Sequence, residues 1–193
     1  MIGGVGQTIG LPQSRKNNVG ETIGLPQNKD IMELPKRKPN RLKQYDYSQP
    51  GAYFVTICTD KRRCLLGDVA AVGETIGLPS HVKLSVYGKT ADDAINKICE
   101  CYPTVTVDKY VIMPNHIHLL LQLHADDGRA MLAPTVSTII AQMKGYVTKR
   151  TGVSIWQKSF HDHVVRDEKD YLEIWEYIDG NPAKWEEDCF YSE

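Results

Sequence analysis

The sequence predicts an α+β domain with a ferredoxin-like arrangement, in which helices pack on an antiparallel sheet. Short runs rich in β-branched and aromatic residues, typical of strands, alternate with segments whose apolar residues recur at helical spacing. Two of the strand-like runs are joined by a Pro-Asn turn, which favours a hairpin. With 193 residues and 41% hydrophobic content, the chain is long enough for one compact domain and too short for two ordinary ones.

Each element of this domain has a local signal. Strands are expected where β-branched residues cluster, helices where apolar residues return every three or four positions, and ends where Gly or Pro interrupts them. The expected elements, in chain order, are a strand at 52–59, a helix around 91–98 closed by Tyr102-Pro103, strands at 105–113 and 116–123, a helix from 136 to about Gly152, and a last helix from about 168 to 180 stopped by Asn181-Pro182.

A repeated peptide shapes the domain organisation. Val-Gly-Glu-Thr-Ile-Gly-Leu-Pro, with Gln in place of Glu in the first copy, occurs in 5–13, 19–27 and 72–80. The unequal spacing excludes a solenoid, and each copy is too short and too rich in Gly and Pro to bury a face. We expect residues 1–40 to be a disordered, repeat-bearing extension and 41–187 to be the folded domain. Residues 72–80 are then a loop insertion, and 188–193 a tail.

The repeated heptapeptide also has an unusual coding property. It can be written GGG-GAG-ACC-ATC-GGT-CTC-CCC, in which the first three codons are the reverse complement of the last three. A peptide selected for folding has no reason to follow that rule, whereas a DNA hairpin inserted in frame follows it automatically. We hypothesise that residues 6–12, 20–26 and 73–79 are translated copies of a palindromic repeat. A duplicated linker peptide is the alternative.

Charge is compatible with nucleic-acid binding without requiring it. The formal net charge of −1 averages basic blocks at 36–43 and 61–63 with a strongly acidic segment from Asp167 onward. Further basic residues cluster between positions 137 and 166, where they are Lys144, Lys149, Arg150, Lys158 and Arg166. Basic residues on an ordinary solvated face remain the alternative.

No targeting signal or membrane segment is evident, so a cytoplasmic location is expected. The amino terminus has no basic and apolar signal pattern, and the longest apolar stretch, around Leu119–Leu121, is too short to cross a bilayer. The five cysteines are odd in number and form no C-x-x-C pair. They are expected to be reduced thiols, not a disulfide framework or a zinc site.

The string Met113-Pro-Asn-His-Ile-His-Leu-Leu-Leu121 is the sharpest candidate for a functional site. On a strand, alternate side chains share a face, so His116 and His118 point together while Ile117 points into the core. Two adjacent imidazoles on a rigid strand make half of a metal site. A bare H-x-H pair also occurs as two polar residues on a half-exposed strand. A second such pair, His161 and His163, lacks an apolar back face and is expected in a loop or near DNA.

The last predicted helix can supply a nucleophile and a third ligand. Its apolar stripe, which should pack on the sheet, comprises Tyr171, Ile174, Trp175 and Ile178. Tyr177 lies off this stripe, with Asn181 one turn beyond it, so an amide oxygen could join the metal while the phenol reaches the substrate. Tyr171 and Tyr146 are better explained as packing residues. Trp156 could stack on a base, although buried packing is favoured.

These motifs together resemble the single-tyrosine HUH transposases. His116-Ile-His118 after Met-Pro-Asn, then Ile155-Trp-Gln-Lys-Ser-Phe160, then Tyr177-Ile-Asp-Gly-Asn-Pro182 occur in the family's order. Within that superfamily the chain is most similar to the REP-associated tyrosine transposases of bacteria, an IS200-like group. The resemblance covers roughly Arg41 to Trp185, interrupted by the repeat at 72–79.

The resemblance implies an activity and its participants. His116, His118 and Asn181 would hold a divalent metal, Mg²⁺ or Mn²⁺, and Tyr177 would attack single-stranded DNA at hairpin-forming repeats to leave a 5′-phosphotyrosine. The expected location becomes the bacterial cytoplasm with association to the nucleoid, and a homodimer is one possible assembly. The residues expected to bind DNA are basic: Arg41, Lys43, Lys61, Arg62, Arg63, Lys144, Lys149, Arg150 and Lys158.

Two alternatives remain open at this point. A domesticated protein could bind DNA hairpins without cutting them, although intact His116, His118 and Tyr177 argue against that. A metal-dependent hydrolase or oxygenase could also use an H-x-H strand. That class needs a further carboxylate or histidine ligand on a neighbouring strand, and the sequence offers no such candidate.

Overall fold

A computed structural model describes residues 45–70, 81–125 and 134–191. Its central sheet has the strand order β4-β5-β1-β6, and every neighbouring pair is antiparallel. The strands are β1 (Gly51–Cys58), β4 (Val105–Ile112), β5 (His116–Leu123) and β6 (His161–Val164). This order, in which β1 and β4 are separated by β5, is that of a ferredoxin-like sheet and confirms the predicted fold class.

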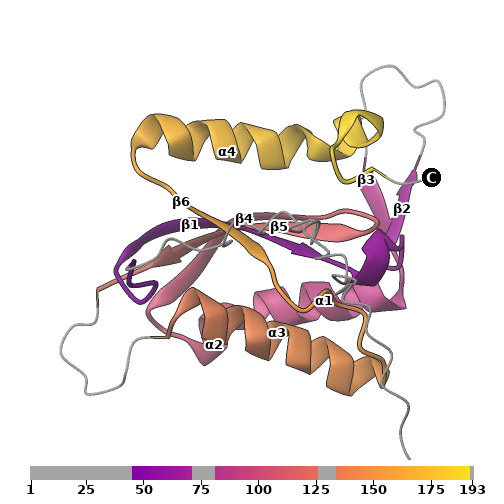
Figure 1. Ribbon diagram of the computed structural model, residues 1–193, viewed down its shortest axis with the longest axis horizontal. Coiled ribbons are helices and arrows are strands. Elements are labelled where there is room, and N and C mark those ends of the chain that lie inside the picture. Colours follow the sequence, from indigo (N-terminus) through magenta and orange to yellow (C-terminus); the bar gives the residue numbers. More distant parts are fainter. Residues whose placement is uncertain (1–44, 71–80, 126–133, 192–193) are drawn as a thin grey trace, which may run out of the picture. The chain divides into compact units, whose positions relative to one another are not determined.

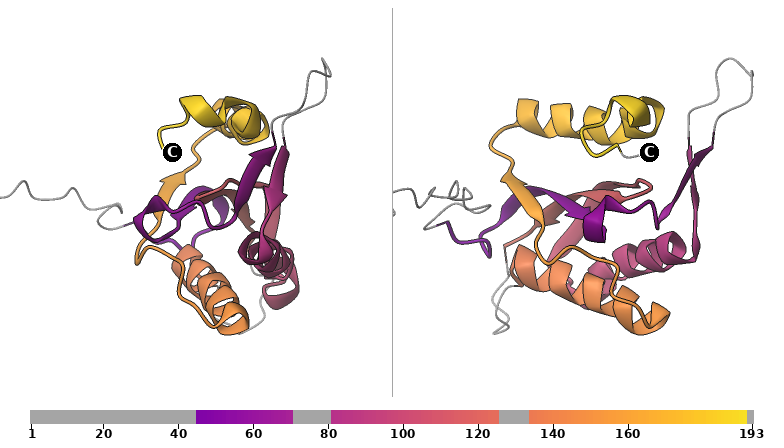
Figure 2. Two further views of the ribbon diagram at one scale, coloured as in Figure 1. Left: turned by 90° about the vertical axis from the view of Figure 1, so that its right-hand side faces the viewer. Right: turned by 45° about the vertical axis from the view of Figure 1, so that its right-hand side comes forward.

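Helices cover both faces of the sheet (Figure 1). The connections between strands, α1 (Val86–Asn96), α2 (Ile98–Cys101) and α3 (Val136–Thr151), lie on one face. The last helix, α4 (Glu168–Gly180), lies on the opposite face, and the views of Figure 2 agree with this arrangement. The sheet is therefore sandwiched, and its two faces have different partners.

The main core lies between the sheet and α1 and α3. From β5 it receives Ile117, Leu119 and Leu121, and from α3 it receives the residues at helical spacing that the sequence predicted, Val136, Ile139, Ile140, Met143 and Val147. A smaller cluster on the other face joins Leu120 of β5 to Ile174 and Ile178 of α4, with Tyr171 and Trp175 packed against it. The predicted apolar stripe of the last helix is confirmed. Trp156 is buried in the main core, in agreement with the packing role that the sequence analysis favoured over base stacking.

Capping side chains and a glycine determine where the long helices begin and end. Ser85, Thr135 and Asp167 occupy the N-cap positions of α1, α3 and α4, and each side chain accepts a hydrogen bond from a backbone N–H of the first turn. Gly152 follows α3 with φ of 72°, the left-handed conformation that ends helices and that glycine adopts without steric cost. These signals explain why the predicted bounds of α3 and α4 are nearly those observed.

Short strands and the last turn depart from the prediction. A two-stranded ribbon, β2 (Gly67–Ala70) with β3 (His81–Leu84), precedes α1 and was not expected. The prediction that His161 and His163 lie in a loop is wrong, because both lie on β6, which pairs with β1. Strands of four residues carry too little periodicity to be recognised alone, and their pairing depends on the neighbouring strand.

The chain also continues past the predicted stop at Asn181-Pro182. Asn181 keeps helical angles, φ −59° and ψ −43°, and 3-10 turns extend from Asn181 to Glu187 (η2). Proline is tolerated there because it stands in the first turn of the new helix, where its missing N–H is not needed. A further 3-10 turn, η1 (Asp60–Arg62), follows β1.

Some predictions lie outside the described residues, namely the extension 1–40 with Arg41 and Lys43, and the insertion 72–80. Within the described part of the chain, no helix combines the length and the apolar character needed to cross a membrane. The five cysteines all lie in that part, where none forms a disulfide and only Cys58 is buried.

Candidate active site

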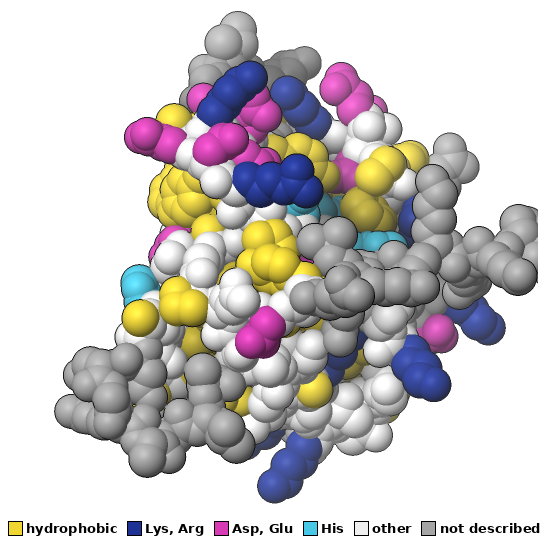
Figure 3. Space-filling model, turned by 60° about the vertical axis from the view of Figure 1, so that its left-hand side comes forward, with side chains coloured by type: hydrophobic (Ala, Val, Ile, Leu, Met, Phe, Trp, Pro, Cys, Tyr) yellow, Lys and Arg dark blue, Asp and Glu magenta, His cyan; other side chains and the backbone are white. Residues whose placement is uncertain are grey.

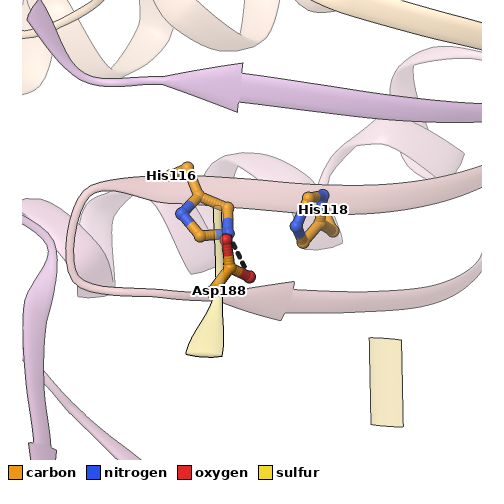
Figure 4. A group of neighbouring side chains, drawn as sticks. All are labelled: His116, His118 and Asp188. Atoms are coloured by element: carbon orange, nitrogen blue, oxygen red, sulfur yellow. Dashed lines mark ion pairs between the residues drawn. The ribbon is translucent and has the colours of Figure 1, made fainter. Parts of the chain in front are cut away.

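Two buried imidazoles lie side by side on the α4 face of β5. His116 and His118 are 0% and 1% exposed, and their ring centroids are 4.5 Å apart. Figure 4 shows both rings projecting from the same face of the strand, with Asp188 in front of His116. The intervening Ile117 points into the main core. The predicted alternation along this strand is therefore confirmed.

Hydrogen bonds orient both rings. The amide nitrogen of Asn115 donates to the backbone oxygens of Arg62 (3.1 Å) and Phe190 (2.8 Å), so its oxygen faces His116. That oxygen accepts from Nδ1 of His116 at 2.8 Å, which places the proton on Nδ1 and leaves the Nε2 lone pair free. Thr56 Oγ1 of β1 is 2.9 Å from Nδ1 of His118, whose Nε2 also points toward the site.

Burial keeps both histidines neutral. It lowers the pKa of His116 to about 4, although the nearby Asp188 carboxylate works in the opposite direction. Burial, followed by the neighbouring His116, lowers the pKa of His118 well below its usual value. Because metal ions bind the neutral imidazole, the pair is in its ligating form at neutral pH.

Tyr177 brings a phenol to this pair from α4. Its hydroxyl is 3.2 Å from Nε2 of His118 and 3.4 Å from Oδ2 of Asp188, while the side chain is 42% exposed. Phe54 of β1 packs edge-on against its ring and stacks on His118. Burial and the Asp188 charge raise the pKa of Tyr177 to about 12, so the phenol keeps its proton at neutral pH. The group is accessible to a substrate and is held beside the imidazoles.

Asn181 and Asp188 complete the cluster. Asn181 is 3% exposed, and its amide nitrogen donates to Asp188 Oδ2 at 2.8 Å. The Asp188 side chain is 2% exposed, and its Oδ2 lies 3.9 Å from Nε2 of His116. Two polar atoms in this cluster, Nε2 of His116 and Oδ1 of Asn181, are buried without a hydrogen-bond partner. Buried polar atoms of this kind are costly unless an ion or water satisfies them.

The donor set fits a divalent metal. One ligand atom from each of His116, His118 and Asp188 lies within 4.8 Å of the others, and the unpaired oxygen of Asn181 belongs to the same cluster. Neutral imidazole nitrogens with carboxylate and amide oxygens suit first-row divalent ions, and Mn²⁺ tolerates such a mixture better than Mg²⁺. A cation would also compensate the buried negative charge of Asp188.

The sequence did not identify Asp188, because the predicted domain ended at 187. Its position depends on residues 185–190, which fold back over the histidines. The rings of Trp185 and Phe190 lie 5.9 Å and 4.7 Å from the ring of His116, and the Arg62 guanidinium lies over Phe190 and donates to Cys189 O. No local periodicity signals such a contact, although Asn115, which anchors Phe190, stands inside the motif string.

A cavity of about 280 Å³ opens beside Tyr177. Tyr177, Asn181, Lys184 and Asp188 line it together with Glu176 and Glu187. On the face drawn in Figure 3, basic and acidic side chains are intermixed, so that face does not present a uniformly positive surface. A phosphate entering here would meet a cation only at Lys184 among these residues, unless a metal is bound.

The predicted DNA-binding residues fall into separate regions. Lys61, Arg62 and Arg63 lie at η1, and Arg62 reaches the site through Phe190 and Cys189. Lys149 and Arg150 lie in the last turn of α3, on the opposite face of the sheet (Figure 1). Lys144 of α3 is partly buried and donates to the backbone oxygens of Gln157 and Ser159. Lys158 lies on the connection that Lys144 supports, and its side chain is exposed.

Comparisons with known proteins point to one group. The chain is 33% identical to an uncharacterised Haemophilus influenzae protein over 80% of this chain and 93% of that one. It is 31% identical to a second protein of that organism, assigned to the REP-associated tyrosine transposases, over 72% of this chain and 74% of the relative. No protein-family model matches.

A solved structure shares the fold. It is that of a REP-associated tyrosine transposase bound to a REP hairpin, and it matches with a TM-score of 0.54. The match covers 75% of this chain and 73% of the other, at 24% identity.

Proposed function

Because the chain belongs to the REP-associated tyrosine transposases, we propose that it cuts and rejoins single-stranded DNA at hairpin-forming repeats with the Tyr177 hydroxyl as nucleophile. The observation that carries this proposal is the position of that hydroxyl. It lies 3.2 Å from a buried, neutral histidine pair and beside a buried carboxylate, yet its side chain remains 42% exposed.

The proposed chemistry is a phosphoryl transfer to tyrosine. The Tyr177 oxygen forms a bond to phosphorus and the bond from phosphorus to the 3′ oxygen breaks. The phenol loses its proton to solvent, and the departing 3′ oxygen takes one up. The products are a 5′-phosphotyrosine and a 3′-hydroxyl. Since the phosphodiester energy is conserved in the new bond, attack by a second 3′-hydroxyl can join strands without ATP.

A divalent ion would be held by His116, His118, Asn181 and Asp188. Such an ion, when bound, polarises the non-bridging oxygens of the scissile phosphate and offsets charge in the transition state. The protein's own part is orientation. Asn115 and Thr56 fix the two rings, and Phe54 holds the phenol beside them. We infer that the catalytic unit is 41–187 extended by Asp188.

DNA is proposed to approach over η1 and the cavity beside Tyr177. Lys61 and Arg63 are exposed there, and Lys184 lines the cavity. Lys149 and Arg150 would contact only a more distant part of a bound hairpin, because α3 lies behind the sheet. Cleavage also requires room for the scissile phosphate near His116, where Phe190 and Trp185 now pack.

Incubation of the full chain with single-stranded hairpin oligonucleotides and Mn²⁺ tests the proposal. We expect a covalent protein–DNA adduct that survives denaturing electrophoresis and is absent with EDTA. Hairpin binding without any adduct, in all metals tried, would instead support a domesticated protein that binds hairpins without cutting. Absence of both binding and adduct would contradict the proposed function altogether.

A further inference from the structure

The two-stranded ribbon places one repeat copy at a position that the fold does not need. The last backbone pair of β2 and β3 is Ala70 with His81. Ends paired in this way can be joined by a turn of two residues, yet residues 71–80 lie between them. The third copy, 73–79, lies wholly within this connection. Added length at a hairpin tip costs little closure entropy, so such a site tolerates insertion.

The ribbon's base, by contrast, is tightly constrained. Ser85 caps α1 and also donates to Leu65 O at 2.6 Å. A Cβ at Gly88 would lie 2.0 Å from Leu66 O, and one at Gly67 would lie 2.6 Å from Lys83 O. The contacts of Ser85 and Gly88 attach the base of the ribbon to α1, and the absence of a Cβ at Gly67 lets β2 approach β3 closely. The ribbon stands beside the central sheet in Figure 2, and the candidate active-site residues come from other elements.

The repeated unit has the coding pattern of a nucleic-acid palindrome. All three copies share the Val before the unit, and the residues before that Val differ: Met1-Ile-Gly-Gly in the first copy, Lys16-Asn-Asn in the second and Val69-Ala-Ala in the third. A perfect stem determines six codons uniquely, because Gly pairs with Pro only as GGG with CCC, Glu with Leu only as GAG with CTC, and Thr with Gly only as ACC with GGT. When Val is GTG, its last two bases pair with the first two bases of the Gln codon, so the stem of the first two copies gains two base pairs.

We propose that the three copies are DNA palindromes translated in frame, and that the single-stranded hairpin form of this protein's own gene is a ligand of its His116–Tyr177 site. The inference rests on the proposed function and specifies its substrate as a stem of GGGGAGACC and GGTCTCCCC around ATC. Gln7, in place of Glu21 and Glu74, corresponds to one base change, GAG to CAG, and hence to one mismatch in the stem.

The nucleotide sequence of the gene provides the first test. The proposal requires those six codons, or nearly all of them, in the second and third copies. Synonymous codons that break the stem while preserving the peptide would overturn it and favour a duplicated linker peptide.

Binding provides the second test. The full chain in EDTA is titrated, by fluorescence anisotropy, with an oligonucleotide of codons 72–80 and with a synonymously recoded one, GTT-GGT-GAA-ACA-ATC-GGA-TTA-CCT-TCT, that lacks the stem. We expect binding to the gene sequence to be tighter by about tenfold or more. A panel of unrelated hairpins is the control. If one of them binds and the gene hairpin does not, this inference fails and the proposed function stands. If no hairpin binds, the proposed function fails.

A variant in which residues 71–80 are replaced by Asn-Gly tests whether the repeat acts as a DNA ligand or as a peptide that binds DNA. It should keep the thermal stability of the parent and bind the gene hairpin with the same affinity, and deletion of residues 1–35 should likewise leave both unchanged. A folded variant that loses hairpin affinity would overturn the inference, because the repeat peptide would then itself be part of the binding surface.

Discussion

The two faces of β5 have different roles in this molecule. Toward α1 and α3 the strand presents Ile117, Leu119 and Leu121, all fully buried in a large apolar core. Toward α4 it presents His116 and His118, and Leu120 is its only contribution to the small apolar cluster there. One rigid strand can thus support stability on one side and present two imidazoles to the candidate site on the other, because successive side chains alternate. Substitutions on the two faces should therefore have separable effects.

The largest expected effect is the complete loss of the covalent adduct in Tyr177→Phe, with hairpin affinity nearly unchanged. Only the oxygen proposed as nucleophile is removed, and the ring still packs on Phe54. Tyr146→Phe is the matched control, since its hydroxyl accepts a hydrogen bond from Lys97 on the α3 side of the sheet. Adduct formation is measured on denaturing gels. If Tyr146→Phe removes the adduct and Tyr177→Phe does not, the wrong tyrosine has been assigned.

Substitutions at neighbouring positions of β5 should affect the free energy of unfolding and DNA cleavage separately. Leu119→Ala leaves a cavity in the main core and should cost about 2–5 kcal/mol of unfolding free energy. His118→Ala and His116→Ala should remove metal-dependent cleavage while leaving the domain folded. Urea unfolding in metal-free buffer and the adduct assay are run on the same samples. A stability loss in His118→Ala as large as in Leu119→Ala would assign that histidine a structural role.

The histidines on the α4 face of β5 should also make the free energy of unfolding depend on pH. His116 has a pKa of about 4 in the folded chain and about 6.5 when unfolded, so the unfolded state binds more protons between these values. Stability is thus fully present above pH 6.5 and is lost as the pH falls toward 4. Between pH 7.5 and 5 the loss from His116 should be about 2 kcal/mol.

Urea unfolding in EDTA at the two pH values measures this loss. His116→Gln should reduce it, since glutamine does not titrate. An equal loss in that variant would place the responsible group elsewhere.

Asp188 should contribute to metal affinity without being needed for the fold. Asp188→Asn removes the negative charge but keeps an oxygen, so Mn²⁺ binding should weaken by about tenfold, as ligand charge is reduced. Glu187→Gln, at an exposed position one residue earlier, is the matched control and should bind as the parent does. Calorimetry on the apo protein measures both. Equal affinities in the two variants would remove Asp188 from the ligand set.

The smallest effect is expected in the salt dependence of hairpin binding. This dependence can be compared for basic residues near the site and for those on the α3 side of the sheet. Neutralising Lys61 and Arg63, near the site, should lower the slope of log K against log salt by about 0.7 for each phosphate that these side chains bind. Neutralising Lys149 and Arg150, on the α3 side, should lower the slope less. A larger change from the α3 pair would mean that the hairpin lies across the back of the sheet.

Much of this arrangement is local and could be predicted. The alternation in His116-Ile-His118 determines that both rings share a face, and the helical period places Asn181 one turn after Tyr177. Caps and glycine end the long helices where the sequence indicated. Such features depend on neighbours within a few residues, whose geometry the backbone alone imposes.

Only the tertiary structure decided the rest. The four-residue strands β2, β3 and β6 exist because a partner strand lies beside them, and their own periodicity is too short to specify it. Asp188 reaches His116 because Trp185 and Phe190 pack against that ring and Asn115 binds Phe190 O. These contacts join segments about seventy residues apart in sequence. The histidine pair is therefore evident from the sequence, whereas the carboxylate beside it depends on long-range packing.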